Sequence, residues 1–257
     1  MKKFCFTVDD NIIFLKDLTK GNFKSIFEHP YLNMYKALHD KYNLKVQLNL
    51  FYESEDFCLS EMTDKFKDEW TKNADWLKLS FHSRKENPPM PYEESDYNEV
   101  FADCDSVHRE IIRFAGEKSL SKATTIHFCV VTEKGLNALY DIGVNGLLGL
   151  YGTPDNPRTS YQTPKVLDEK IRQGENVLHN VITYAGIDII LNCFDIDDIR
   201  SKLTALYDRD FIKVMIHEQY FYPFYQHYQP EYMDKLDSTF AHLTQNGYKS
   251  IFFEETI

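Results

Sequence analysis

Two adjacent carboxylates, Asp9 and Asp10, follow an apolar run near the start of the chain. His82 directly follows a second apolar run, and His217 follows a third near the end. Carboxylate oxygens and imidazole nitrogens are ligands for zinc and for other divalent metals. They also accept and donate protons near neutral pH. The four residues therefore predict a site for metal-assisted hydrolysis.

Each of these residues also has an ordinary structural interpretation. Adjacent acids are often solvated turn residues or a helix N-cap, and a single histidine is more often structural than a metal ligand. Side chains alternate along a strand, so one of Asp9 and Asp10 could face a metal while the other faces a reacting water. A cation would also reduce the repulsion between the two acids. The pairing of the acids with His82 favours the chemical interpretation.

Strands and helices alternate along the chain and would position these residues. Apolar runs between longer helical stretches are typical of a parallel sheet wrapped by helices. Strands are expected at residues 4–8, 45–51, 77–81, 125–131, 146–150, 187–191, 213–216 and 250–253. Helices are expected at residues 31–42, 60–73, 97–114, 133–142, 195–207 and 230–246. This pattern predicts an α/β barrel over residues 1–257 as a single domain, with its ligand site at the C-terminal ends of the strands.

Two proline-containing segments lack clear periodicity. Residues 85–97 follow the third expected strand directly, and residues 151–176 are expected to form an insertion or a loop over the site.

Composition limits the partners of the protein. The formal net charge is -11, which disfavours nucleic acid and anionic lipid surfaces. No apolar run approaches the roughly 18 to 20 residues of a membrane span, and the first apolar run stops at Asp9, too early for a signal peptide. The five cysteines are widely spaced without a C-x-x-C pair, which argues against a disulfide framework. A cytoplasmic location is expected.

These segments resemble the motifs of the polysaccharide deacetylase family, also called carbohydrate esterase family four. The fold of that family is a distorted, partly open barrel of seven or eight mainly parallel strands with helices. Residues 7–11 resemble its T-F-D-D-G motif, with Val8 in place of Phe and Asn11 in place of Gly. The resemblance implies that Asp9 is the general base and that Asp10 is a metal ligand.

Of the remaining motifs, one is half kept, one is matched and one is lost. The family's H-S/T-x-x-H motif aligns with residues 82–86, which implies His82 as a ligand and places Glu86 where a second histidine is expected. Glu86 is then either the third ligand or a solvated loop acid, and His108 is a more distant candidate. His217 ends an apolar strand as in the family's last motif, which implies that it is the general acid. The arginine of the family's R-P-P-Y-G segment is missing; His127 lies near its position, where a core histidine is the simpler interpretation.

The resemblance implies a metal-dependent hydrolase that removes an acetyl group, or cleaves a related amide, from a small-molecule or oligosaccharide substrate. Zinc is the expected metal, and nickel, cobalt, manganese or iron would suit the same ligands. Two alternatives stay open: a catalytically silent metal- or carbohydrate-binding barrel, and a hydrolase of a non-sugar amide. The oligomeric state is open as well.

Overall fold

The computed structural model describes residues 1–152 and 160–257. Its larger sheet has the strand order β10-β11-β1-β2-β5, with every neighbouring pair parallel. The short strand β12 adds to the beginning of β1. The strands of this sheet are β1 (Lys3–Asn11), β2 (Val46–Phe51), β5 (Leu77–Ser83), β10 (Ile189–Ile190), β11 (Phe211–His217) and β12 (Lys249–Ser250).

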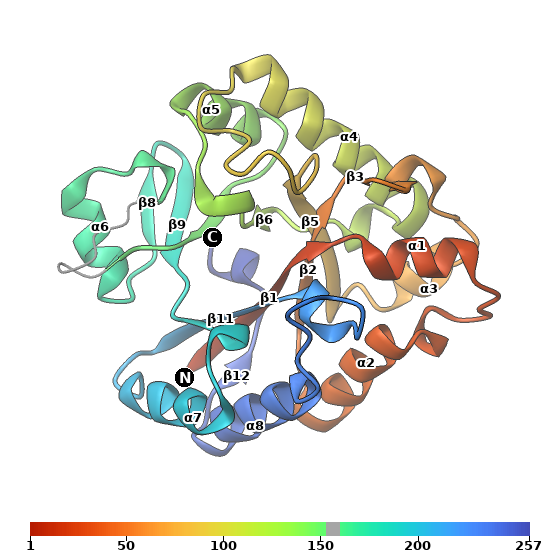
Figure 1. The fold of residues 1–257 in the computed structure, drawn as a ribbon. Helices are drawn as coiled ribbons and strands as arrows, with labels where there is room; N and C mark the ends of the chain where they lie inside the picture. The colour runs from red at the N-terminus through yellow and green to blue at the C-terminus, as the bar shows by residue number, and fades with distance from the viewer. Residues whose placement is uncertain (153–159) are drawn as a thin grey trace.

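A second sheet continues the arrangement, with the order β6-β7-β9-β8. Its strands are β6 (Ala123–Thr124), β7 (Gly146–Gly149), β8 (Val177–His179) and β9 (Ile182–Gly186), of which β8 alone is antiparallel to its neighbour. One isolated parallel bridge, between Leu79 and Leu120, connects β5 to the segment before β6. The mainly parallel α/β fold predicted from the sequence is confirmed, and the strands form two sheets separated by a seam between β5 and β6 (Figure 1).

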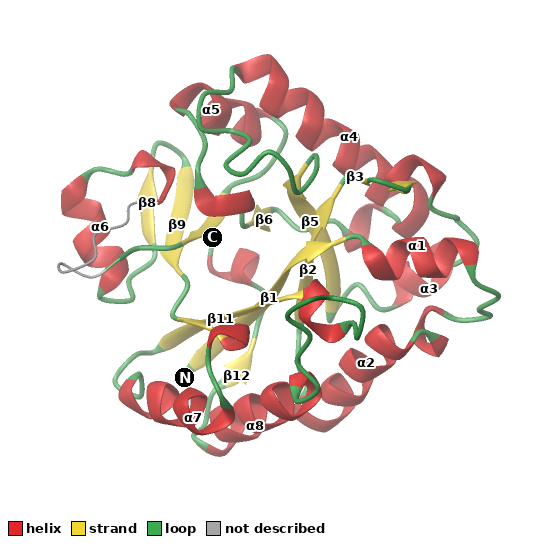
Figure 2. Cartoon of the chain, in the orientation of Figure 1, coloured by secondary structure: helices red, strands yellow, loops and turns green. Residues whose placement is uncertain are grey.

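Helices surround the strands on the outside (Figure 2). They are α1 (Ile13–Lys20), α2 (Pro30–Tyr42), α3 (Lys67–Lys72), α4 (Tyr97–Ala115), α5 (Glu133–Asp141), α6 (Lys165–Arg172), α7 (Ile196–Ala205) and α8 (Tyr232–Gln245). A short hairpin, β3 (Glu53–Ser54) and β4 (Phe57–Cys58), follows β2. None of the helices in the described ranges is long and apolar enough to cross a lipid bilayer.

Aromatic packing fixes β1, the central strand of the larger sheet. The ring of Phe6 lies 5.0 Å from that of Phe240 in α8 and 6.0 Å from that of Tyr35 in α2. Phe4 also stacks on Phe240, at 5.7 Å. Large buried rings of this kind contribute strongly to core stability, so the first half of β1, which leads to Asp9 and Asp10, is held on a rigid support.

Several expected elements differ from the structure. The expected strand at 125–131 is wrong: β6 ends at Thr124, and the chain turns through a 3-10 segment, His127–Cys129, with left-handed backbone at Phe128 and Cys129. The strand expected at 250–253 is cut to two residues, because a 3-10 helix begins at Phe253. Helix α6 lies within the segment 151–176, which was expected to be irregular, and strand β8 directly follows it. Part of this segment lies outside the described residues.

Candidate active site

The structure brings together all five residues proposed from the sequence. Asp9 and Asp10 end β1, His82 lies at the end of β5, and His217 ends β11. With Glu86 they line one cavity of about 440 Å³, here called the first cavity. It lies at the C-terminal ends of parallel strands, where barrels of this type hold their ligands.

A bulge at the end of β1 turns both carboxylates toward the first cavity. The pairing of β1 with β2 shifts register between Val8 and Asn11, and Asp10 has a left-handed φ of 63°. In a regular strand, Asp9 and Asp10 would point to opposite faces, whereas a bulge redirects side chains. Strand alternation, expected from the sequence, therefore does not describe this pair.

Asn11 holds the bulge in place. Its side chain is fully buried, and its Nδ2 donates to the carbonyl oxygens of Val8 at 2.6 Å and Asn49 at 3.1 Å. Its Oδ1 accepts a hydrogen bond from the Tyr31 hydroxyl at 2.8 Å. The amide thus satisfies backbone groups that the bulge frees from the strand ladder.

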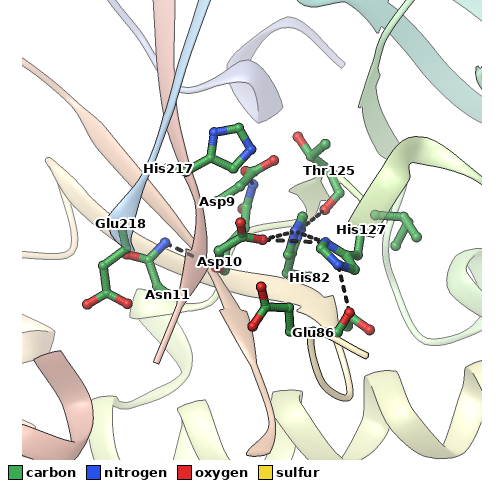
Figure 3. Close-up of polar contacts among 12 residues, drawn as sticks. Asp9, Asp10, Asn11, His82, Glu86, Thr125, His127, His217 and Glu218 are labelled. Atoms are coloured by element: carbon green, nitrogen blue, oxygen red, sulfur yellow. Dashed lines mark hydrogen bonds and ion pairs between the residues drawn. The ribbon is translucent and has the colours of Figure 1, made fainter. Parts of the chain in front are cut away.

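Three side chains converge on one point beside this bulge (Figure 3). Asp10 Oδ1 lies 3.0 Å from His82 Nε2 and 3.4 Å from His127 Nδ1. The two ring nitrogens are 3.1 Å apart. Ligand atoms of a tetrahedral zinc site, with bonds of about 2.0–2.1 Å, lie about 3.3 Å from one another. The spacing of this group, here called the Asp10 cluster, therefore suits a single small cation.

Backbone carbonyls fix the tautomers of both histidines. His82 Nδ1 lies 2.5 Å from the carbonyl oxygen of Thr125, and His127 Nε2 lies 3.1 Å from that of Glu86. A carbonyl oxygen only accepts, so these two nitrogens carry the protons. In the neutral rings, the lone pairs of His82 Nε2 and His127 Nδ1 then face each other and Asp10. Such a contact is stable only with a cation or an additional proton between the three atoms. The hydrogen bonds from the opposite ring nitrogens to backbone carbonyls are those that metal-bound histidines usually make.

The surroundings shift the pKa values of the cluster in different directions. Burial alone would raise the pKa of Asp10, but its close contacts with His127 and His82 outweigh burial and hold that pKa well below the ordinary range. Burial would lower the pKa of His82, but the carboxylates of Asp9 and Asp10 raise it overall. Negative charge at Asp10 is thus strongly favoured, as expected of a metal ligand.

Asp9 and His217 lie next to the Asp10 cluster on neighbouring strands. They are register partners in the β1–β11 pair. Burial raises the pKa of Asp9, against the lowering effect of the nearby His82 and His217. Asp9 Oδ1 accepts from Asn49 Nδ2 at 2.7 Å. His217 Nδ1 lies 2.9 Å from Asn192 Oδ1, which accepts its proton and leaves Nε2 available for another partner.

Glu218, the residue after His217, joins β11 to the beginning of α1. Its carboxylate is fully buried and accepts the backbone amides of Ile12, Ile13 and Phe14 at 2.7, 2.9 and 2.8 Å. The Tyr222 hydroxyl donates a fourth hydrogen bond at 3.1 Å. Burial raises the pKa of Glu218 to about 7 in spite of these donors. This carboxylate satisfies the free amides of the α1 N-terminus and couples the strand end that carries His217 to the one that carries Asp10.

His127 is the member of the cluster that was not expected from the sequence. Placing a strand at 125–131 made it an internal strand residue, whereas the true strand end at Thr124 gives it the same strand-end position as His82 and His217. The exposed side chain of Glu86 lines the first cavity, while its carbonyl holds His127. His108 lies buried in α4, 3.5 Å from Cys104 Sγ, and is not part of the Asp10 cluster.

Among known proteins, similarity to this chain was found only in the comparison with solved structures. No family model and no curated protein matches the sequence. A CE4 family pseudoenzyme from Bacillus anthracis, BA3943, superimposes with a TM-score of 0.54 at 10% identity, over 99% of this chain and 64% of the pseudoenzyme. The Bc1960 peptidoglycan N-acetylglucosamine deacetylase gives a TM-score of 0.57 at 12% identity, over 98% of this chain and 86% of the deacetylase.

A family 4 acetyl xylan esterase from Clostridium thermocellum, solved with a cobalt ion, gives a TM-score of 0.52 at 13% identity. The match covers 99% of this chain and 89% of the esterase. The chain therefore has the fold of the CE4 structures, as the resemblance of its motifs predicted. The chain spans just under two thirds of the pseudoenzyme's length.

Proposed function

We propose that this protein is a metal-dependent hydrolase that removes an acetyl group from a carbohydrate-like substrate. The observation that carries the proposal is the Asp10 cluster. In it two histidine ring nitrogens, whose lone pairs point inward, and one carboxylate oxygen lie 3.0–3.4 Å from one another. Asp9 and His217 add a base and an acid beside it. The fold shared with CE4 structures supports the same chemistry.

The metal would be held by Asp10, His82 and His127. One oxygen and two imidazole nitrogens suit zinc, cobalt, nickel or iron. Glu86 remains the alternative third ligand expected from the sequence, since its side chain lines the same cavity. The first ligand set is preferred because the Glu86 backbone already orients His127 toward Asp10.

The remaining residues supply proton transfers. A divalent cation held at the Asp10 cluster would polarise the carbonyl of the scissile amide. Asp9, whose pKa is raised by burial, would accept the proton of the attacking water, since a base works best when its pKa approaches the working pH. His217 Nε2 would protonate the leaving amine, and Asn192 keeps the ring in the required orientation.

Metal analysis of purified variants tests the ligand set. Asp10→Ala, His82→Ala and His127→Ala are each expected to lose most of the bound metal after equilibration with equal zinc, whereas Glu86→Gln keeps it. Acetate release from acetylated sugars, measured on the same preparations, should disappear in the first three variants. Full metal content in His127→Ala combined with loss in Glu86→Gln would reverse the assignment of the third ligand.

A catalytically silent barrel is the second candidate. One proton shared between His82 and His127 would also satisfy their 3.1 Å contact without a metal, and one CE4 structure with this fold is described as a pseudoenzyme. Wild-type protein that takes up no zinc, nickel or cobalt and releases no acetate would establish this candidate. Stoichiometric metal with measurable acetate release would exclude it.

A further inference from the structure

A groove of about 700 Å³ lies between α2 and α3, helices that cover the outside of the larger sheet (Figure 1). The 3-10 helix Ile26–Glu28 contributes to its wall. Among the described residues, it shares no lining residue with the first cavity. Its lining residues, which together are here called the lysine groove, are Lys24, Phe27, Lys36, Lys65, Phe66, Asp68, Glu69, Lys72 and Asn73.

Three lysines of the groove are exposed cations without a carboxylate partner. Lys24, Lys65 and Lys72 are exposed, and the lysine ion pairs within residues 1–152 and 160–257 involve other lysines. The ammonium group of Lys65 lies 4.6 Å from the centre of the Phe66 ring, a contact that restrains the side chain and leaves its charge in place. On a chain with a formal net charge of -11, this group of lysines is a local exception.

The carboxylates of the groove offset only part of this positive charge. Glu69 already accepts hydrogen bonds from Ser25 Oγ at 2.6 Å and from the following backbone amide at 2.8 Å. Lys36, the fourth lysine, pairs with Asp40 at 2.7 Å. Asp68 is the other acid in the lining. With three unpaired lysines against these two acids, the groove attracts anions.

A half-buried aromatic ring lies beside these lysines on a rigid support. Phe27 stacks on Trp76, with ring centres 5.8 Å apart and planes 22° from parallel. Trp76 stacks in turn on His39, at 4.3 Å and 14°, and its Nε1 donates to Asn73 Oδ1 at 2.9 Å. A ring fixed in this way offers apolar surface at little cost in side-chain entropy.

The two features together select a class of ligand. Lysine binds phosphate as a point charge, and the bases of nucleotides stack on aromatic side chains whatever their identity. A plain inorganic anion would not use the ring of Phe27, and an uncharged aromatic compound would not use the lysines. A nucleic acid chain would extend past the groove onto a surface whose overall charge repels it.

We infer that the lysine groove is a binding site for a small nucleoside phosphate. The phosphate groups contact Lys24, Lys65 and Lys72, and the base stacks on Phe27. The Asp10 cluster contributes no residue to this site, so the inference does not depend on the proposed hydrolase.

Calorimetric titration of the wild-type protein with ADP, adenosine and pyrophosphate tests both halves of the site. ADP should bind, and adenosine and pyrophosphate should each bind about tenfold more weakly. The double variant Lys24→Gln/Lys72→Gln should weaken ADP and pyrophosphate by about tenfold and leave adenosine unchanged. Phe27→Leu keeps an apolar side chain, so it should weaken ADP by about tenfold and leave pyrophosphate unchanged.

Two control variants locate the bound ADP. Lys249→Gln removes an exposed lysine that lies outside the groove, and it should bind ADP as the wild type does. His82→Ala should also bind ADP as the wild type does, since loss of binding there would place the phosphates on a metal at the Asp10 cluster. Because Lys24 and Lys72 are exposed, the double variant should fold normally, which circular dichroism checks.

Four results would each overturn the inference. They are absence of ADP binding to the wild type, equal ADP affinity in the lysine double variant and the wild type, pyrophosphate binding as tight as that of ADP, and loss of ADP binding in His82→Ala.

Discussion

Asp9 and Asp10 are neighbours in the chain, but their surroundings give them different chemistry. Close contacts with two histidines hold the pKa of Asp10 well below its ordinary range, whereas burial raises the pKa of Asp9. An ionised carboxylate within contact distance of two ring nitrogens suits a metal ligand, and a carboxylate with a raised pKa is a better proton acceptor. The two proposed roles therefore follow from environment and not from residue type.

Replacement of Asp9 by Asn should separate these roles. Asp9→Asn keeps the side-chain volume and removes the proposed base, so bound metal should remain while kcat falls by about 10²- to 10⁴-fold. Metal analysis and steady-state acetate release on one preparation provide the test. Loss of metal together with activity would show that Asp9 is instead needed for ligand binding.

The long buried strands were predictable from the sequence, whereas the short ones were predictable only in part: β7 was expected and β6 was not. Strands β1, β2, β5 and β11 have six to nine residues of strongly apolar character, so their ends and the residues that follow could be located. Strand β6 has only two residues and is defined by pairing with β7, which local composition does not encode. His127 was missed for this reason, since its importance depends on where β6 ends.

Helix α4 contains a buried histidine that should make stability sensitive to acid. Burial lowers the pKa of His108 to about 4, compared with about 6.5 in an unfolded chain. Between these values the unfolded chain binds more protons, so the free energy of unfolding decreases as the pH falls from about 6.5 to 4. The decrease attributable to His108 approaches about 1.4 kcal/mol per pH unit in the middle of this window.

Chemical denaturation of wild type and His108→Leu at several pH values between about 4 and 6.5 gives the free energy of unfolding of each protein. The contribution of His108 is the difference between the two proteins in the slope of this free energy against pH. The variant should lose stability less steeply on acidification, whatever its absolute stability. Parallel curves for the two proteins would contradict the assignment to His108.

At the scale of the whole molecule, the Asp10 cluster spans the seam between the two sheets. Asp10 and His82 belong to the larger sheet, whereas His127 follows β6 of the second sheet. Few backbone hydrogen bonds between strands cross this seam within the described residues. Side-chain hydrogen bonds take their place, such as that from Ser80 Oγ to the Ala123 carbonyl oxygen at 2.8 Å. A metal held by all three residues would therefore join two parts of the fold.

Metal binding should consequently stabilise the protein against heat. Zinc at 100 times its Kd is expected to add about 2.7 kcal/mol to the free energy of unfolding, and a chelator should remove it. Differential scanning calorimetry with and without chelator checks this, with His127→Ala as the variant that gains nothing. A wild-type Tm that is unchanged by every divalent metal would argue against a resident metal.

The left-handed backbone of Asp10 sets folding and the proposed metal binding against each other. A non-glycine residue at a φ of 63° costs about 1 kcal/mol relative to glycine, so the most favourable residue for folding at this position has no side chain to bind a metal. Among variants that lack the carboxylate, Asp10→Gly should be about 1 kcal/mol more stable than Asp10→Ala in urea denaturation, the reverse of the usual order for these two residues. Selection for thermal stability alone would thus favour a glycine at this position, and that glycine would abolish the cluster.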